Sequence, residues 1–196
     1  MSTLLKILTL LIDVFGSLYL CVILLRFLLQ TARADFYNPI SQAIVKLTNP
    51  VVIPLRRFIP GLWGIDLATL LFALLFHAII MQLFILIQAQ QFVNPLYLLI
   101  WSMVGLALNI ITLYLIAGFV LFISSFIAPY SNHPALLLVR QIMAPILSPI
   151  QRFIPAIGGL DFSLFFAGIF LMILRIVIID LAALIGTPTK LLVGYA

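Results

Sequence analysis

Four stretches of the chain are almost wholly apolar, and each is long enough to cross a lipid bilayer. They cover residues 4–29, 67–87, 95–125 and 162–185. A helix needs about 20 residues to cross a hydrocarbon layer about 30 Å thick. The first stretch is too long for the apolar part of a signal peptide, and no small-residue cleavage site follows it. The pattern therefore predicts four transmembrane helices, the first of them uncleaved.

Two further stretches, residues 38–60 and 133–155, have a different pattern of apolar and polar positions. In the first of them, Pro39 suits the opening position of a helix, and apolar residues then recur at helical spacing opposite polar ones. Pro50 and Pro54 lack backbone N–H donors, so we expect them to break this helix into two short pieces. The pattern favours amphipathic segments in the plane of the membrane over the alternative, a plain solvated loop.

These two stretches are copies of one another, because identical residues recur 95 positions apart without a gap. Nine matches at one fixed offset are far more than chance would give, so the chain is a tandem duplication. The matched pairs are Pro39 and Pro134, Pro50 and Pro145, Pro54 and Pro149, Arg57 and Arg152, Phe58 and Phe153, Ile59 and Ile154, Pro60 and Pro155, Gly64 and Gly159, and Asp66 and Asp161.

The duplication divides the chain into two repeats, residues 1–94 and 95–196, each made of a helix, an in-plane segment and a second helix. Because each repeat crosses the membrane twice, both should have the same orientation, related by an axis along the membrane normal. In each copy a glycine should turn the chain and an aspartate should cap the next helix: Gly64 and Asp66, then Gly159 and Asp161. The predicted fold class is an all-α membrane protein with four transmembrane helices in two tandem parallel repeats.

Composition agrees with a membrane protein and excludes several other classes. The chain is 65% hydrophobic and 8% charged, whereas soluble domains carry about 25% charged residues. The net charge of +5 does not indicate nucleic-acid binding, because the basic residues are spread among the apolar stretches. The single cysteine, Cys21, excludes a disulfide framework within the chain and a cysteine-rich metal site.

The distribution of basic residues predicts the orientation in the membrane. Positive residues favour the cytoplasmic side of a membrane protein. The other side would carry only Lys6 and Lys190, beside an uncharged central turn. We therefore expect the in-plane segments to be cytoplasmic and both termini to lie outside. The basic residues in the two in-plane regions are Arg33, Lys46, Arg56, Arg57, Arg140 and Arg152.

The repeated motif resembles the YggT (YlmG) family of small bacterial and plastid membrane proteins, over nearly the whole chain. The first copy carries the motif on Asn38, Pro39, Asn49, Pro50, Pro54, Arg56, Arg57, Pro60, Gly64 and Asp66. The second copy carries it on Pro134, Pro145, Pro149, Arg152, Pro155, Gly158, Gly159 and Asp161.

The second copy departs from the motif where Gln151 replaces the first arginine of a pair, Ala144 an asparagine, and His133 the residue before the first proline. If the arginine pair binds a ligand, the second copy should bind it more weakly. The resemblance implies a non-enzymatic protein of the bacterial inner membrane, whose two termini would then be periplasmic. Family members are associated with osmotic tolerance and potassium homeostasis, with cell division and nucleoid distribution, and, in plastids, with maturation of the cytochrome b6 subunit.

Besides Lys6 and Arg26 near the ends of the first predicted span, three charged residues lie within the predicted spans, where polar groups are candidates for function. Asp13 lies in the first apolar stretch, and Arg175 and Asp180 lie in the fourth. All three should occupy one leaflet, so we expect Asp13 or Asp180 to pair with Arg175. The pair would lock the first and last spans together; the alternative is part of an ion path.

His77 and Asn109 fall near the middle of the second and third predicted spans, and we expect a hydrogen bond between them. Ligation of haem by His77 is the alternative. His133, the other histidine, lies at the predicted membrane surface, too far for both to ligate one haem in a monomer. The sequence therefore predicts no cofactor and no metal. It also contains no nucleophile–base pair, paired carboxylates or phosphate loop, so we do not expect an enzyme.

The candidate binding residues are Arg56, Arg57 and Arg152, basic residues beside apolar ones in the in-plane segments. They suit anionic lipid headgroups or acidic groups of a partner, either another membrane protein or a second copy of this chain. Simple anchoring by positive charge is the alternative. Arg26, at the end of the first span, should extend to the membrane surface. We favour a scaffold or assembly factor; the alternative is a channel or transporter component in potassium or osmotic homeostasis.

Overall fold

The described residues form six helices and no strand in a computed structural model that describes residues 3–62, 64–128, 131–153 and 162–187. Four of these helices are long and apolar enough to cross a membrane. The predicted fold class is therefore confirmed, and the chain is a multi-pass membrane protein. The helices are α1 (Thr3–Thr31), α2 (Pro39–Phe58), α3 (Leu67–Ala89), α4 (Pro95–Ile127), α5 (Pro134–Phe153) and α6 (Ser163–Leu184), of which α1, α3, α4 and α6 are the long apolar ones.

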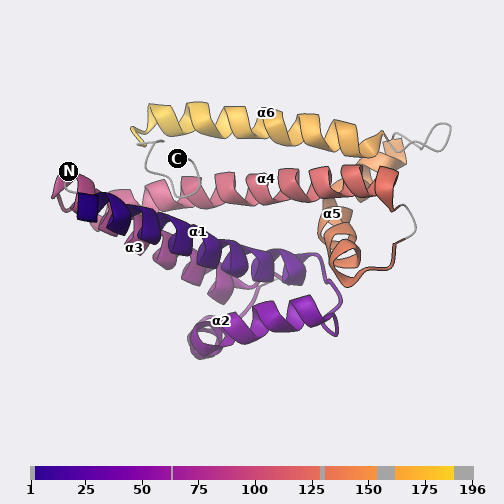
Figure 1. The fold of residues 1–196 in the computed structure, drawn as a ribbon, viewed down its shortest axis with the longest axis horizontal. Helices are drawn as coiled ribbons and strands as arrows, with labels where there is room; N and C mark the ends of the chain where they lie inside the picture. The colour runs from indigo at the N-terminus through magenta and orange to yellow at the C-terminus, as the bar shows by residue number, and fades with distance from the viewer. Residues whose placement is uncertain (1–2, 63, 129–130, 154–161, 188–196) are drawn as a thin grey trace.

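The two repeats build the same arrangement of three helices. In the first repeat α1, α2 and α3 all contact one another, and in the second α4, α5 and α6 do the same. The repeats join through α3 and α4, while α1 and α6 make no contact. Figure 1 shows α2 below α1 and α3, and α5 beside the end of α4; α1 begins and α6 ends on the same side of the molecule.

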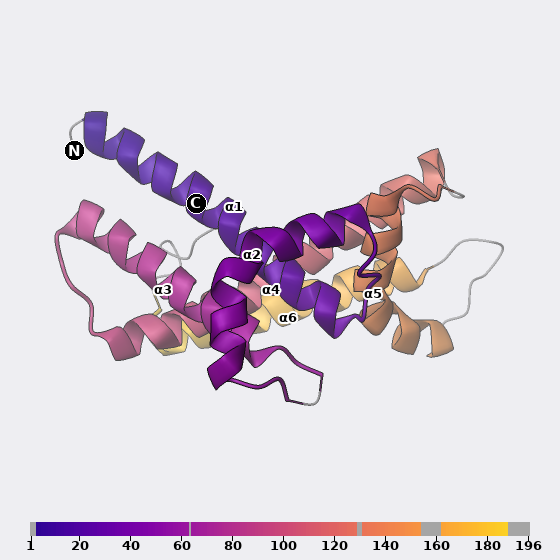
Figure 2. The same cartoon turned by 90° about the horizontal axis from the view of Figure 1, so that it is seen from below.

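Each amphipathic stretch forms one helix, so the predicted break at the prolines is wrong. Pro50 and Pro54 lie inside α2, and Pro145 and Pro149 lie inside α5. A proline removes one hydrogen bond and bends a helix, but the bonds on either side can continue it. Figure 2 shows α2 sharply bent along its length. The bend lets one helix follow the end of α1 and then turn toward the start of α3.

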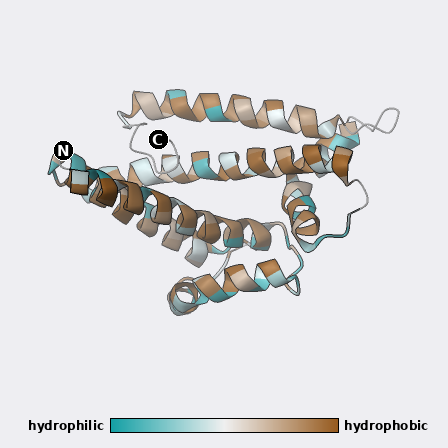
Figure 3. Ribbon diagram, viewed as in Figure 1, coloured by the Kyte–Doolittle hydropathy of each residue, from teal (hydrophilic) through white to brown (hydrophobic). Residues whose placement is uncertain are grey.

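The long helices meet through small and aromatic residues rather than through polar ones. A Cβ atom added to Gly16 of α1 would lie 3.1 Å from Cγ2 of Ile80 on α3, so the glycine permits a close approach. One turn further, the ring of Tyr19 packs edge-on against Phe76, with centroids 5.2 Å apart. Leu106 of α4 belongs to the same cluster of buried side chains. Figure 3 shows mostly hydrophobic residues along these helices and mixed character along α2.

The turn between α2 and α3 has the conformation that the sequence predicts. Gly64 has φ +84°, a left-handed conformation that glycine adopts without strain. Leu62 and Ile65 exchange backbone hydrogen bonds of 3.1 and 2.9 Å around it. Asp66 then caps α3, because its side chain accepts a hydrogen bond from the backbone N–H of Thr69, which confirms the predicted cap. The corresponding residues of the second copy, Pro155, Gly159 and Asp161, lie outside the described residues.

Candidate functional site

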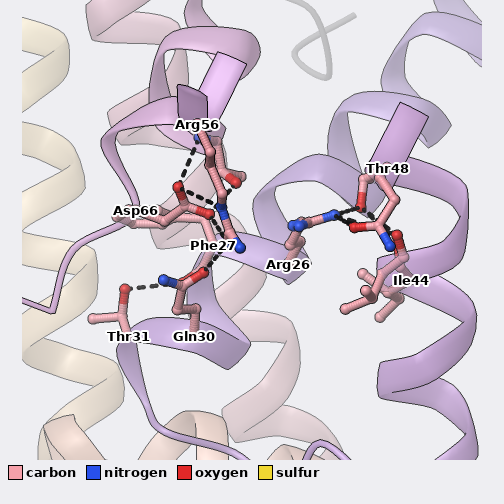
Figure 4. Close-up of polar contacts among 11 residues, drawn as sticks. Arg26, Phe27, Gln30, Thr31, Ile44, Thr48, Arg56 and Asp66 are labelled. Atoms are coloured by element: carbon pink, nitrogen blue, oxygen red, sulfur yellow. Dashed lines mark hydrogen bonds and ion pairs between the residues drawn. The ribbon is translucent and has the colours of Figure 1, made fainter. Parts of the chain in front are cut away.

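Arg26 is buried under α2, and its predicted extension to the membrane surface is wrong. Its side chain is 4% exposed. Nη1 donates to Oγ1 of Thr48 at 2.6 Å, to Oδ1 of Asn49 at 2.9 Å and to the backbone oxygen of Val45 at 3.3 Å (Figure 4). Thr48 in turn donates to the backbone oxygen of Ile44, which fixes its hydroxyl oxygen toward Arg26. The polar face of α2 thus supplies oxygen acceptors that the headgroup region would otherwise provide.

Arg56 connects all three helices of the first repeat. Its Nη2 forms an ion pair with Oδ2 of Asp66 at 2.5 Å and donates to Oε1 of Gln30, at the end of α1, at 2.7 Å. Thr69 of α3 also donates to Oδ2 of Asp66, through its hydroxyl. Figure 4 shows Arg56 directed at Asp66 and Gln30 rather than away from the protein. The first arginine of the predicted binding pair is therefore engaged within the protein.

The contacts around Asp66, which precedes the membrane-spanning part of α3, shift its protonation equilibrium. Burial of the carboxyl group would raise its pKa, but hydrogen bonds from Arg56 and Thr69 outweigh burial, and the pKa is lowered from the ordinary value of 3.8. Asp66 is therefore a carboxylate at neutral pH. One negative charge is thus held at the junction of α2 and α3, where it compensates Arg56.

A cavity of about 470 Å³ lies beside these contacts, between the end of α1 and α2. Three arginines line it, and in the described part of the chain no aspartate or glutamate does. Arg33, in the loop after α1, has φ +50°, an uncommon left-handed conformation for a residue with a side chain. The arginines are Arg26, Arg33 and Arg56; the polar residues Gln30, Ser41 and Asn49 also line the cavity, which we call the first-repeat cavity.

The second repeat has a cavity of about 360 Å³ at the equivalent place. Most of its lining positions correspond to those of the first-repeat cavity at the offset of 95 residues, but their chemistry differs. Leu121 stands at the position of Arg26, Ala144 at that of Asn49 and Gln151 at that of Arg56. Among the described residues that line this cavity, the one arginine is Arg140, at the position of Val45. The buried cluster of polar contacts is therefore a property of the first repeat.

The other predicted binding arginines, Arg57 and Arg152, are exposed. Each lies in the last turn of its helix, α2 or α5, next to an exposed phenylalanine: Phe58 is 83% exposed and Phe153 is 86% exposed. Within the described part of the chain, neither arginine has a hydrogen bond or an ion pair. The repeat thus places a basic and an aromatic side chain together at two related sites.

The structure separates the two helices that an ion pair between Asp13 and Arg175 would join, because α1 and α6 do not contact one another. Asp13 accepts a weak hydrogen bond from Ser17 on its own helix, at 3.5 Å. The other predicted partner, Asp180, lies on the same helix as Arg175; Asp180 is exposed and Arg175 is partly buried. The pairing of Arg175 with Asp180 stays a prediction.

The predicted hydrogen bond between His77 and Asn109 is also wrong. Asn109 donates to the backbone oxygen of Gly105 on its own helix, at 2.8 Å. Both ring nitrogens of His77 are buried and have no hydrogen-bond partner among the described residues. No group of three His, Cys, Asp or Glu side chains that could hold a metal ion occurs there either.

The two repeats also touch through the starts of their amphipathic helices. Asn38 caps α2 by accepting from the backbone N–H of Ile40, and its side-chain amide donates to the backbone oxygen of Pro134, in α5, at 2.8 Å. The backbone N–H of Asp35 donates to Oε1 of Gln141, also in α5, at 2.9 Å. The repeated motif prolines Pro39 and Pro134 therefore mark where the two copies meet.

The fold and the site define a class of multi-pass helical membrane protein, made of two copies of a unit with two long apolar helices and an amphipathic helix between them. The sequence model of one family, described as CCB3/YggT, matches residues 5–89 and again residues 97–182. The chain belongs to this family. The double match also confirms the internal repeat.

Relatives of the chain are known from several bacteria. A protein of Pseudomonas aeruginosa described as uncharacterised is 42% identical over 178 residues, which is 90% of each chain. One of Vibrio alginolyticus is 42% identical over 160 residues, 78% of this chain and 83% of the relative. The protein YggT of Escherichia coli (strain K12) is 38% identical over 158 residues, 80% of each chain. No solved structure matches this chain.

Proposed function

We propose that this protein is a non-enzymatic scaffold of the bacterial inner membrane, whose two amphipathic helices hold anionic lipid and a partner membrane protein at the cytoplasmic surface. The observation that carries the proposal is the duplicated arrangement of Arg57 beside Phe58 and Arg152 beside Phe153. Each pair is exposed and lies at the end of an amphipathic helix.

The chemistry of these pairs suits a membrane surface. The free energy of a phenylalanine side chain falls when it enters the boundary between lipid headgroups and acyl chains. A neighbouring guanidinium group then lies at the level of the lipid phosphates. Each basic residue near an anionic membrane surface contributes about 1 kcal/mol of attraction. Because guanidinium groups also form paired hydrogen bonds with carboxylates, the same side chains can hold an acidic partner.

The assignment to the cytoplasmic surface rests on the excess of Lys and Arg around α2 and α5. We also propose a role in osmotic tolerance for this chain, because the family resemblance implies one. A scaffold at the membrane surface supports such a role by holding other membrane proteins where anionic lipid is concentrated.

The proposal is tested by replacing Arg57 and Arg152 together with alanine. We expect the purified double variant to retain about tenfold less anionic lipid than the unchanged protein, because two charge-assisted contacts are lost. The matched control replaces Lys6 and Lys190 with alanine. This change also removes two positive charges, but from residues outside the two amphipathic helices. Phosphatidylglycerol retained through purification and counted by mass spectrometry gives the measurement; equal retention in both variants would refute the lipid contact.

A second arm distinguishes a scaffold from a channel. The protein is placed in phosphatidylglycerol-containing liposomes, and potassium flux is followed with a fluorescent indicator. We expect no flux above that of empty liposomes. Flux that is abolished in the Arg57→Ala, Arg152→Ala variant would overturn the scaffold and make the amphipathic helices part of a potassium pathway.

A further inference from the structure

Arg26 is a buried cation that donates no hydrogen bond to a carboxylate in the described part of the chain. Its three hydrogen bonds all go to neutral oxygens, and all use Nη1. The nearby carboxylate of Asp66 is paired with Arg56, and the charges of these two residues act on Arg26 in opposite directions. They therefore offset the removal of the Arg26 guanidinium group from water only in part. A second observation is therefore needed to show where the counter-charge comes from.

The first-repeat cavity is that observation, because it lies against Arg26 and carries an excess of positive charge. Arg26 and Arg33 line it, Arg56 lies at its edge with Asp66, and no acidic side chain among the described residues lines it. Within the described part of the chain, Nε and Nη2 of Arg26 and the side chain of Arg33 have no hydrogen-bond partner. Donors of fixed charge that face one cavity without protein acceptors are suited to an anion.

The second repeat shows that the unit folds without this cluster. The same three helices form with Leu121 at the position of Arg26, Met143 at that of Thr48 and Ala144 at that of Asn49. Met143 and Leu121 are buried there in an ordinary apolar cluster. The buried arginine and its acceptors are therefore not required to join the amphipathic helix to its spans.

We propose that the first-repeat cavity binds a phosphate group, held by Arg26 and Arg33 with Arg56 at its edge. The phosphate is either the headgroup of an anionic lipid or a free phosphate ion, since both present the same oxygens to guanidinium donors. The polar side chains Gln30, Ser41 and Asn49 line the same space. Arg57 and Arg152 do not line this cavity. The proposed phosphate site can therefore be tested independently of the proposed scaffold function.

The sharpest variant is Arg33→Asn. It removes one positive charge from the cavity, and asparagine accepts the left-handed backbone at this position better than most residues. The side chain of Arg33 has no hydrogen bond in the described part of the chain, so the fold should not depend on it. Arg26→Gln is the second variant. Lys6→Gln, which removes an exposed positive charge from a residue that does not line the cavity, is the matched control, and Arg57→Gln tests the exposed pair separately.

The first measurement is the thermal unfolding of the detergent-purified protein in sodium phosphate, against sodium chloride of equal ionic strength. The second repeats it with phosphatidic acid against phosphatidylcholine in mixed micelles. We expect phosphatidic acid to raise Tm for the unchanged protein and, by the same amount, for Lys6→Gln. We expect Arg33→Asn to need about tenfold more of the ligand for the same rise, as the loss of one charge-assisted contact implies.

The two arms identify the source of the phosphate. A rise in Tm with both probes, lost in Arg33→Asn, indicates a site open to free phosphate; a rise with phosphatidic acid alone indicates a lipid headgroup. An equal rise in Arg33→Asn and the unchanged protein, or no rise with either probe, would overturn the proposal. Loss of the effect in Arg57→Gln alone would place the phosphate at the exposed pair, against the cavity but in agreement with the scaffold.

Discussion

At the scale of single residues, the two copies have kept their prolines and diverged in their buried polar groups. The first copy holds Arg26, Thr48 and Asn49 in one hydrogen-bonded cluster, and joins Arg56 to Asp66 beside it. The second copy has apolar side chains at the positions of Arg26 and Thr48. A buried charge is stable only where neighbouring groups accept its hydrogen bonds. Replacing one residue of such a cluster therefore favours replacement of the others. The cluster around Arg26 therefore has apolar side chains at two of its positions in the second repeat.

The ion pair of Arg56 and Asp66 should contribute measurably to stability. Asp66→Asn keeps an oxygen for the cap on Thr69 but removes the charge that faces Arg56, whose side chain is 42% exposed. We expect a loss of about 2 kcal/mol in the free energy of unfolding, reduced from that of a fully buried pair by the exposure of Arg56. Denaturant unfolding in detergent gives the measurement. The exposed Asp180→Asn is the control, and an equal effect there would contradict the role of the pair.

The same carboxylate predicts a pH dependence. Because the pKa of Asp66 is lowered in the folded protein from 3.8, its contribution is complete above about pH 5 and is lost as the pH falls through the folded-state value. We expect Tm to fall on acidification below about pH 4, and the Asp66→Asn variant to show a smaller fall. Parallel curves for the two proteins between neutral and acidic pH would show that Asp66 is not responsible.

At the scale of elements, α1 and α3 approach closely where Gly16 faces Ile80. Glycine in a helix interior weakens the isolated helix, but between two membrane helices it lets their backbones approach and increases dispersion contacts. In the second repeat Ile111 stands at the position of Gly16. Gly168 of α6 makes no comparable contact, because the described structure has no atom within 4 Å of a Cβ added there.

Gly16→Val should separate α1 from α3 and lower the free energy of unfolding by about 1–3 kcal/mol, the usual cost of overpacking. Gly168→Val places the same side chain in open space on α6 and should change stability much less. Combining Gly16→Val with Ile80→Ala should recover part of the loss, because the shortened side chain makes room. Chemical unfolding of the three variants measures this, and no recovery in the double variant would argue against the contact.

At the scale of the whole molecule, the two repeats are joined through α3 and α4 and through the starts of α2 and α5. The faces of α1 and α6 are not joined in the same way, so the pseudosymmetric arrangement is open rather than closed. An open arrangement needs specific contacts between the repeats to fix their relative position. The hydrogen bond from Asn38 to Pro134 is such a contact.

Asn38→Asp separates the two roles of this residue. Aspartate still caps α2 by accepting from Ile40, but it has no amide to donate to the backbone oxygen of Pro134. We expect a loss of about 1 kcal/mol in the free energy of unfolding, the usual net value of one hydrogen bond. Asn94→Asp is the matched control, because Asn94 caps α4 in the same way beside Pro95. Equal stability of the two variants would show that the contact between the repeats contributes nothing.

The sequence by itself determined the four spans, the duplication, the turn at Gly64 and the cap at Asp66. These follow from local composition, periodicity and backbone preference, which do not depend on distant residues. Tertiary structure decided that α2 continues through its prolines, that Arg26 turns inward and that Arg56 pairs with Asp66. It also separated Asp13 from Arg175 and His77 from Asn109. The physical reason is that a polar group in a membrane protein takes its partners from whichever helix packs against it, and helix packing is a long-range property that local pattern does not contain.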